Sequence, residues 1–338
     1  MQYTKLGGSD LEVSRICLGA MGFGVPDEKH PWTIGYEESL AVIKEALDCG
    51  ITFFDTAFGY NHGTSEEFLG RALRECGAAR EHVQIATKFT PPSAETRAQG
   101  YSDGGWVRHC LDTSLGRLGE DYVDLYICHW WEADCDMDEV FAAMSSFVDE
   151  GRVRALGVSN MFAWQVADYN ATADARGLHR IDSVQGHYNL INREEEREMI
   201  PYCRSHGIAL TPYSSLAGGR LTRLPEEQRS TKRGRLDEIG VWKYGSTEDA
   251  DRPIIMRVHE LAEKHGVPMA TIALAWELAK VTSPIVGATR PERVGQVVDA
   301  IDVALTPEEI DYLEEPYVPH RLVGVMEQVQ DSMLAQLP

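Results

Sequence analysis

The sequence lacks the features that mark several specialised classes of protein. Lys and Arg number 32 against 53 Asp and Glu, and the net charge of −21 makes nucleic acid and anionic membranes poor partners. No apolar run approaches the roughly 18 residues of a transmembrane helix. The start, MQYTKLGGSDLEV, has no apolar signal core. The seven cysteines include no CxxC pair, which favours reduced thiols. These absences predict a soluble, cytoplasmic protein.

Familiar nucleotide and metal motifs are missing as well. No GxGxxG follows a predicted strand, and GAMGFG at 19–24 has the wrong spacing for a Rossmann site. There is no Walker A motif and no HExxH. The acidic run DCDMDE at 134–139 resembles the start of an EF-hand loop, but it lacks the required glycine and the final glutamate. An acidic helix start explains this run better, and we predict no metal site.

What is present is a regular alternation of short apolar runs with helical segments. A hairpin is expected over residues 2–16, around the turn GGSD. Eight apolar runs follow, separated by segments with helical spacing such as 36–50, 65–76 and 106–119. This order predicts a (β/α)8 TIM barrel with an N-terminal β-hairpin and a C-terminal helix or tail. The runs lie at 15–19, 51–56, 83–89, 123–129, 153–159, 182–188, 207–213 and 283–289.

We expect one domain over residues 1–338, with a core of about 1–316 and a tail at 317–338. Residues 221–253 read as a long polar connection after the seventh barrel strand, and such loops are often lids or binding loops. Helix starts are marked at Thr306, which precedes Pro307 and Glu309 in a capping box, and by the similar pattern at 289–292.

Polar residues end three consecutive barrel strands, where barrel enzymes carry their chemistry. Asp55 ends the second strand and Tyr60 follows it, Lys88 lies at the end of the third, and His129 ends the fourth. Taken singly, the aspartate could cap a helix, the tyrosine could serve only in packing, and the histidine could be a core residue. Lys88 is harder to explain, because an unpaired lysine is costly to desolvate. Their convergence on one barrel mouth favours a catalytic site.

The four side chains suit acid catalysis at a carbonyl oxygen. A nearby ammonium lowers the pKa of a phenol, so Lys88, held by Asp55, is expected to assist proton donation by Tyr60. A neutral His129 would hydrogen-bond the same oxygen and orient the substrate. Such acid catalysis is useful when hydride reaches the carbonyl carbon, and nicotinamide cofactors supply hydride.

The sequence around these residues resembles the aldo-keto reductase family. DTAFGYNHGTSEE at 55–67, ATKF at 86–89 and RLGEDYVDLYICHW at 117–130 are similar to its catalytic segments, and the likeness spans about 1–316. The tail EEPYVPHRLVG at 314–324 resembles the aryl-alcohol-dehydrogenase-like branch. The resemblance implies an NADPH-dependent carbonyl reductase, and a catalytic tetrad of Asp55, Tyr60, Lys88 and His129.

The resemblance also implies the residues that bind the cofactor, NADPH or NADP+. Those at the nicotinamide would be Ser159, Asn160, Gln185 and the stacking Tyr213. Those at the pyrophosphate would be Ser214, Leu216 and Gly218, and those at the adenosine end Gly287, Thr289, Arg290, Arg293 and Gln296. Arg293, helped by Arg290, is the expected ligand of the 2′-phosphate, because a planar guanidinium suits phosphate.

Three positions depart from the family pattern. Gln296-Val297 stands where Glu-Asn is usual, which puts one adenine contact in doubt. Asn61 replaces a glycine after the tyrosine, and Trp131 stands where proline often follows HW.

The expected pocket lining is aromatic and favours a hydrophobic or aromatic aldehyde or ketone, with a sugar or steroid as the alternative. We expect a monomer or a weak homo-oligomer. Three rival functions stay open: an aldolase that forms a Schiff base at Lys88, a non-catalytic NADP(H)-binding regulatory or sensor subunit, and an enzyme working mainly as an alcohol dehydrogenase or epimerase. The residues expected to line the substrate pocket are Met21, Phe23, Trp32, Phe58, Trp130 and Trp131.

Overall fold

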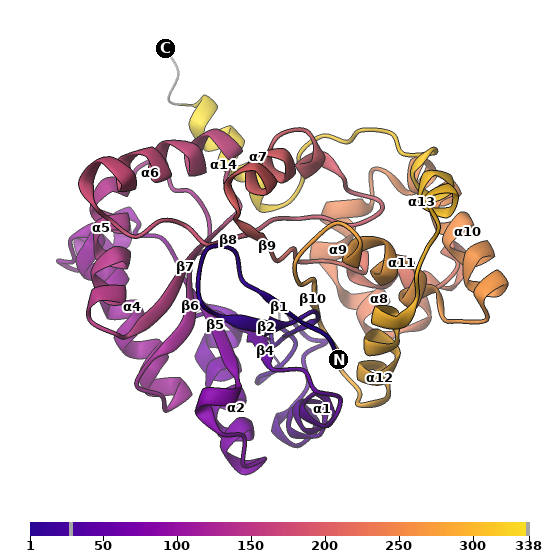
Figure 1. Cartoon of the computed structure of the whole chain (residues 1–338), viewed down its shortest axis with the longest axis horizontal. Helices are drawn as coiled ribbons and strands as arrows, with labels where there is room; N and C mark the ends of the chain where they lie inside the picture. The colour runs from indigo at the N-terminus through magenta and orange to yellow at the C-terminus, as the bar shows by residue number, and fades with distance from the viewer. Residues whose placement is uncertain (27–29, 336–338) are drawn as a thin grey trace.

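The computed structural model describes residues 1–26 and 30–335, and a ring of parallel strands lies at its centre (Figure 1). Eight strands pair in parallel in the order β10-β3-β4-β5-β6-β7-β8-β9. All eight strands expected from the sequence are present, although several are shorter than the apolar runs. They are β3 Cys17–Gly19, β4 Phe53–Asp55, β5 Gln84–Phe89, β6 Val123–Cys128, β7 Val153–Ser159, β8 Ser183–Gln185, β9 Ala209–Leu210 and β10 Ile285–Val286.

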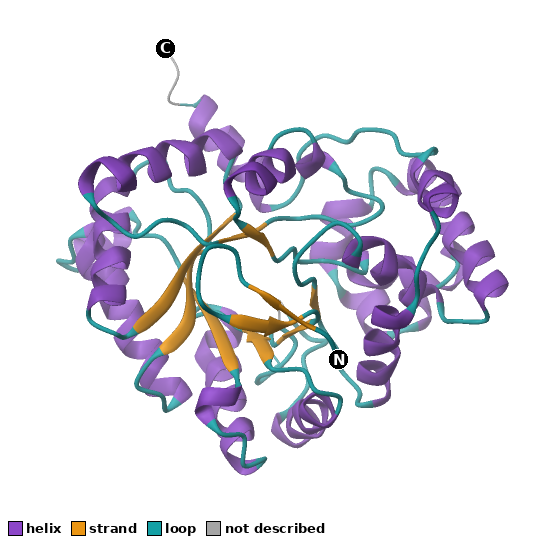
Figure 2. Ribbon diagram, in the orientation of Figure 1, coloured by secondary structure: helices purple, strands orange, loops and turns teal. Residues whose placement is uncertain are grey.

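Backbone hydrogen bonds connect the two ends of this sheet. The Ile285 amide donates to the Pro212 carbonyl at 2.8 Å, and the Thr282 amide donates to the Leu210 carbonyl at 3.0 Å. The last strand therefore returns to the side of β9, and helices surround the strands (Figure 2). This arrangement confirms the (β/α)8 barrel.

An antiparallel hairpin closes one end of the barrel, as predicted. It consists of β1 Tyr3–Lys5 and β2 Glu12–Ser14. Leu6, Leu11 and Val13 of this hairpin region are buried in one apolar cluster with inward-facing strand residues such as Phe53 and Leu125. The hairpin fills the barrel end opposite the carboxyl ends of the strands, so chemistry is expected at the other end.

The helices form the outer layer, each with an apolar face on the strands. In α1, Val42, Ile43 and Ala46 are buried on one side at helical spacing. No helix in the described part of the chain is long and apolar enough to cross a membrane. The α-helices are α1 Tyr36–Asp48, α2 Thr64–Glu75, α3 Ala94–Ala98, α4 Asp103–Leu118, α5 Met137–Asp149, α6 Ala163–Arg176, α7 Met199–His206, α8 Lys232–Leu236, α9 Glu238–Tyr244, α10 Glu248–His265, α11 Met269–Leu278, α12 Glu292–Val298, α13 Pro307–Glu314 and α14 Val325–Leu334.

Short 3₁₀ turns complete the connections: η1 Tyr60–Gly63, η2 Arg80–His82, η3 Glu194–Glu196, η4 Ala217–Thr222, η5 Pro225–Ser230 and η6 Asp299–Asp302.

One of the two expected helix caps is present. The Thr306 hydroxyl accepts from the Glu309 amide, and the Glu309 carboxylate accepts from the Thr306 amide, so α13 has its capping box. The cap predicted at 289–292 is wrong: Pro291 is the N-cap of α12 and no side chain caps that helix. A proline that already has helical backbone angles leaves Thr289 outside the turn.

The long polar connection expected at 221–253 is not one continuous loop, because this segment carries η5, α8, α9 and the start of α10. Thr231 and Asp237 accept hydrogen bonds from the backbone of Gly234 and Gly240 and so begin α8 and α9. Lys243 and Tyr244 are buried. Residues 217–244 are called the insertion below. Their many charged residues are the reason that the sequence did not predict the helical turns.

The chain after α13 is held against the barrel and ends in α14, beside α6 (Figure 1). The Tyr317 hydroxyl donates to Glu194, and His320 lies 3.1 Å from Asp251 of α10. Gln165 of α6 donates to the sulfur of Met333 in α14. The expected C-terminal helix is therefore present, and residues 336–338 of the tail lie outside the described residues.

Candidate active site

The parallel register brings the predicted catalytic residues to one edge of the barrel. Asp55 pairs with Gly19 on one side and Ala86 on the other. Lys88 pairs with Ile127 one strand further along, and His129 directly follows β6. Because the carboxyl ends of parallel strands meet at the same edge, these side chains converge.

Lys88 is the centre of this group. Its side chain is fully buried, and Nζ donates to Asp55 Oδ1 at 2.6 Å, to the Thr56 carbonyl at 2.8 Å and to the Tyr60 hydroxyl at 3.2 Å. Burial alone would lower the pKa of Lys88, but the Asp55 carboxylate and these hydrogen bonds outweigh burial and raise it. The lysine is therefore a fixed ammonium at neutral pH.

Tyr60 and His129 lie edge to face, with ring centroids 5.7 Å apart. Burial, followed by the Lys88 charge, lowers the pKa of His129 well below its usual range. The imidazole is thus neutral, and its ring can hydrogen-bond a carbonyl oxygen.

The pKa of Tyr60 is raised overall, in contrast to the expected lowering. Burial raises the pKa of Tyr60 by more than the Lys88 ammonium lowers it. The sequence showed the neighbouring cation but not the depth of the site. A phenol that stays protonated at neutral pH still has the proton that a general acid needs.

Asn61, the departure from the family glycine, has a structural explanation. Its φ is +48°, a left-handed conformation that asparagine tolerates better than most residues. Its side-chain amide donates to the carbonyls of Met21 and Phe23, both at 2.9 Å. Asn61 therefore keeps the turn after Tyr60 and also fastens the loop that follows β3.

The four residues predicted at the nicotinamide are close together. The Tyr213 hydroxyl donates to Asn160 Oδ1 at 2.8 Å, and Asn160 Nδ2 donates to Ser159 Oγ at 2.9 Å. Ser159 Oγ donates to the Gln185 carbonyl at 2.8 Å. Gln185 Nε2 donates to Asp55 Oδ2 at 2.9 Å, so this group is joined to the Lys88 group across the barrel.

The turn after β9 has an unusual backbone conformation. Ser214, Ala217, Gly218 and Gly219 all have positive φ, between +49° and +98°. The Ala217 and Gly219 amides donate to the Ser214 and Leu216 carbonyls, so both N–H groups are used within the turn. The predicted pyrophosphate residues Ser214, Leu216 and Gly218 therefore lie together in this one turn.

Several arginines lie close enough beyond this turn to affect one another's pKa values. Burial lowers the pKa values of Arg223 and Arg293. The charge of Arg293 lowers the pKa of Arg223 further. The charges of Arg290 and Arg233 lower the pKa of Arg293 in the same way. Neither Arg223 nor Arg293 forms an ion pair with a described carboxylate. Mutually repelling, half-buried guanidinium groups fit a phosphate ligand. Gly287, Thr289 and Arg290 precede α12, and the exposed Gln296 lies within the helix, three residues after Arg293.

The insertion also reaches across the barrel mouth. The Arg233 guanidinium lies 4.2 Å from the ring centroid of Trp32 and donates to Asp237 at 2.9 Å. Lys243 Nζ lies 4.6 Å from the ring centroid of Tyr213, and burial lowers the pKa of Lys243 to about 8. Arg223, Arg233 and Lys243 were missed in the sequence. The two arginines lie in a basic segment, 220–235, of an acidic chain, which is the signal that could have indicated them; Lys243 lies outside it.

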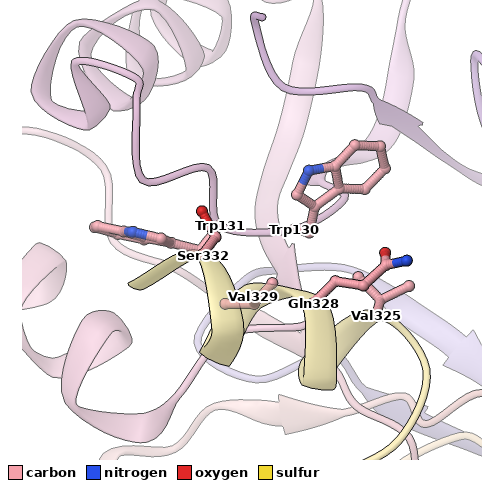
Figure 3. A pocket seen from close by; sticks show the side chains of 6 residues that line it. All are labelled: Trp130, Trp131, Val325, Gln328, Val329 and Ser332. Atoms are coloured by element: carbon pink, nitrogen blue, oxygen red, sulfur yellow. The ribbon is translucent and has the colours of Figure 1, made fainter. Parts of the chain in front are cut away.

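The six residues predicted to line the substrate pocket occupy different environments. Phe23 is fully buried in the core and Trp32 is buried beneath Arg233. Met21 and Phe58 are half-buried near the mouth, with Phe58 against Trp106. Trp130 and Trp131 line a pocket of about 120 Å³ together with four residues of α14 (Figure 3).

Comparison with known proteins agrees with this geometry. The model of the Aldo/keto reductase family matches residues 15–317. The versiconal hemiacetal acetate reductase of Aspergillus parasiticus is 41% identical, over 94% of this chain and 98% of the relative. A putative aryl-alcohol dehydrogenase of Schizosaccharomyces pombe is 36% identical, over 95% of this chain and 97% of the relative. Another putative aryl-alcohol dehydrogenase, from Saccharomyces cerevisiae, is 35% identical over 95% and 98%.

Proposed function

The chain belongs to the aldo-keto reductase family, and we propose that it reduces an aldehyde or ketone to the alcohol with NADPH, using Tyr60 as the general acid. The observation that carries this proposal is the buried group in which Lys88 touches both Asp55 and Tyr60. A charged lysine beside a protonated phenol is suited to proton donation and to little else.

The chemistry follows from the positions of the four side chains. The nicotinamide cofactor, when bound, supplies a hydride to the carbonyl carbon. As charge builds on the carbonyl oxygen, the Tyr60 O–H bond breaks and its proton passes to that oxygen. The Lys88 ammonium, 3.2 Å away, stabilises the phenolate left behind. Neutral His129 donates a hydrogen bond to the same oxygen and fixes its direction.

The choice of NADPH over NADH rests on the arginines. Arg293 and Arg223 are half-buried, and burial with the neighbouring arginines lowers their pKa values, although Glu227 raises that of Arg223; this unfavourable cluster of cations supports a 2′-phosphate as their ligand. Arg233, stacked on Trp32, supports a role for the insertion as a clasp that slows cofactor release.

An aromatic or hydrophobic carbonyl is the proposed substrate. Trp130 and Trp131 provide apolar walls, and relatives named aryl-alcohol dehydrogenases support an aryl alcohol as product. The aldolase alternative fits less well, because the Asp55 ion pair keeps Lys88 protonated, and a Schiff base needs the free amine. A sensor subunit would bind NADPH without turnover.

The test is direct. NADPH binding is followed by the change in its fluorescence, and the purified protein is then offered NADPH with aromatic and aliphatic aldehydes. Oxidation of NADPH matched by alcohol formation is the expected result. Tight binding without turnover of any carbonyl would favour the sensor function, and absence of NADPH binding would overturn the proposal.

A further inference from the structure

The pocket that contains Trp130, a neighbour of His129, is built from two segments that are far apart in the sequence. One wall is Trp130 and Trp131, directly after His129. The other is one face of α14, where positions 325, 328, 329 and 332 follow helical spacing. A tail helix thus completes a wall that begins next to a proposed catalytic residue.

This helix is fixed rather than loosely attached. Met326 and Val329 are buried, and Gln165 of α6 donates to Met333 at 3.4 Å. In the segment before it, the His320 amide donates to Glu194 Oε1 at 2.9 Å. Side chains on the pocket face of α14 are therefore presented from a constant position.

The lining combines apolar walls with two polar groups. Trp130, Trp131, Val325 and Val329 provide indole and aliphatic surface, and no charged side chain lines the pocket. The Gln328 amide and the Ser332 hydroxyl are its polar side chains. Neither side chain has a hydrogen-bond partner within residues 1–26 and 30–335. Such a site excludes ionic groups and offers hydrogen bonds to neutral ones.

Size and position limit what the pocket can hold. Its volume is about 120 Å³, less than the roughly 150 Å³ of a cavity that binds benzene, so the pocket holds one aromatic ring at most. Trp130 lies 5.2 Å from the His129 ring, between centroids. Figure 3 shows Gln328 at the Trp130 end of the pocket and Ser332 at the Trp131 end. A ring attached to the reacting carbonyl would stack on Trp130 and direct its substituents towards Gln328.

We propose that Gln328 is a specificity residue that hydrogen-bonds a neutral substituent, such as a hydroxyl, on the ring of an aromatic aldehyde or ketone. The inference rests on the reductase function proposed above and adds the selectivity of the same site. Gln328 accepts from or donates to the ring substituent and takes no part in hydride or proton transfer.

The experiment compares 3-hydroxybenzaldehyde with 3-methylbenzaldehyde, which have similar size and differ in hydrogen bonding. The ratio of their kcat/KM values is measured for the wild type and for Gln328→Met, which keeps the length of the side chain and removes its amide. A neutral hydrogen bond corresponds to roughly a three- to tenfold effect. The ratio is expected to fall by about that factor in Gln328→Met, mainly through a higher KM for the hydroxylated aldehyde.

Gln330→Met is the matched control, because Gln330 lies on the same helix and is exposed like Gln328 but does not line the pocket. It is expected to keep the wild-type ratio. An unchanged ratio in Gln328→Met, with both aldehydes still reduced, would overturn the inference and leave the reductase function standing. If the wild type reduces neither of these aldehydes nor any other carbonyl, the proposed function itself fails.

Discussion

Lys88 Nζ lies 3.2 Å from the phenolic oxygen of Tyr60, and it is held there by Asp55 Oδ1 at 2.6 Å and by the Thr56 carbonyl at 2.8 Å. The lysine is fully buried, so its charge acts on the phenol through little solvent. Gln185 donates to the second oxygen of Asp55. With these partners fixed, the Lys88 ammonium points towards Tyr60, the proposed proton donor.

The buried pair has a consequence for stability. Lys88→Met leaves the Asp55 carboxylate buried without its cation, and removing one partner of such a pair costs roughly 3–5 kcal/mol. We expect a loss of that size in the free energy of unfolding, measured with urea, and loss of turnover. The double variant Lys88→Met/Asp55→Asn should recover most of the stability and none of the activity. A single variant as stable as the wild type would contradict this account of the pair.

Cofactor selectivity should depend on Arg293. Replacing Arg293 by leucine removes a charge-assisted hydrogen bond to the 2′-phosphate, worth roughly 1.5–3 kcal/mol. The Kd of NADPH should rise by about 10- to 100-fold, while that of NADH, which has no such phosphate, stays the same. Fluorescence titration measures both constants. The control Arg176→Leu, on the outer helix α6, should change neither Kd. If Arg293→Leu raised the Kd values of NADPH and NADH equally, that result would argue against a 2′-phosphate site.

The clasp can be tested through Arg233. Arg233→Gln removes the contact with Trp32 and the ion pair with Asp237, interactions worth about 1–2 kcal/mol together. Release of NADPH, followed by stopped-flow displacement, should become about 5- to 30-fold faster. Arg229→Gln, an exposed arginine in the same insertion, is the control. Identical release rates in the wild type and Arg233→Gln would remove the evidence for a clasp.

The cap of α13 predicts a particular pH dependence. The hydrogen bond from Lys264, followed by that from the Thr306 amide, lowers the pKa of Glu309 from 4.5 to about 2. A carboxyl whose pKa is depressed on folding stabilises the fold above its unfolded pKa, and that contribution is lost as the pH falls towards 2. The urea midpoints of the wild type and Glu309→Gln should therefore differ most near pH 6 and approach each other below about pH 4.5. A constant difference down to pH 3 would contradict this assignment.

Much of the barrel could be predicted from the sequence, because its signals are local. Each parallel strand is an apolar run, and the polar residues that end these runs must meet at one edge. That logic predicts that Asp55, Lys88 and His129 lie together, and the structure brings them to one edge of the barrel. The cap at Thr306 was equally local, since a hydroxyl and a carboxylate three residues apart determine it.

The remainder depends on contacts between distant segments. Nothing near Gln185 in the sequence indicates that it donates to Asp55, 130 residues away. The net pKa of Tyr60 depends on burial that only the assembled site provides. The insertion is rich in charge yet buries Lys243 and Tyr244. The sequence of the tail does not predict that α14 faces Trp130. That contact depends on the route by which the chain runs from α13 to the side of α6.

The most direct test of the central claim is turnover by Tyr60→Phe, with NADPH affinity measured beside it. The variant keeps the ring and loses the proposed proton donor. With an aldehyde that the wild type reduces, we expect kcat to fall by about 10²- to 10⁴-fold while the Kd of NADPH stays within about twofold. Turnover in Tyr60→Phe close to that of the wild type would show that another group supplies the proton, and would contradict the role assigned to Tyr60.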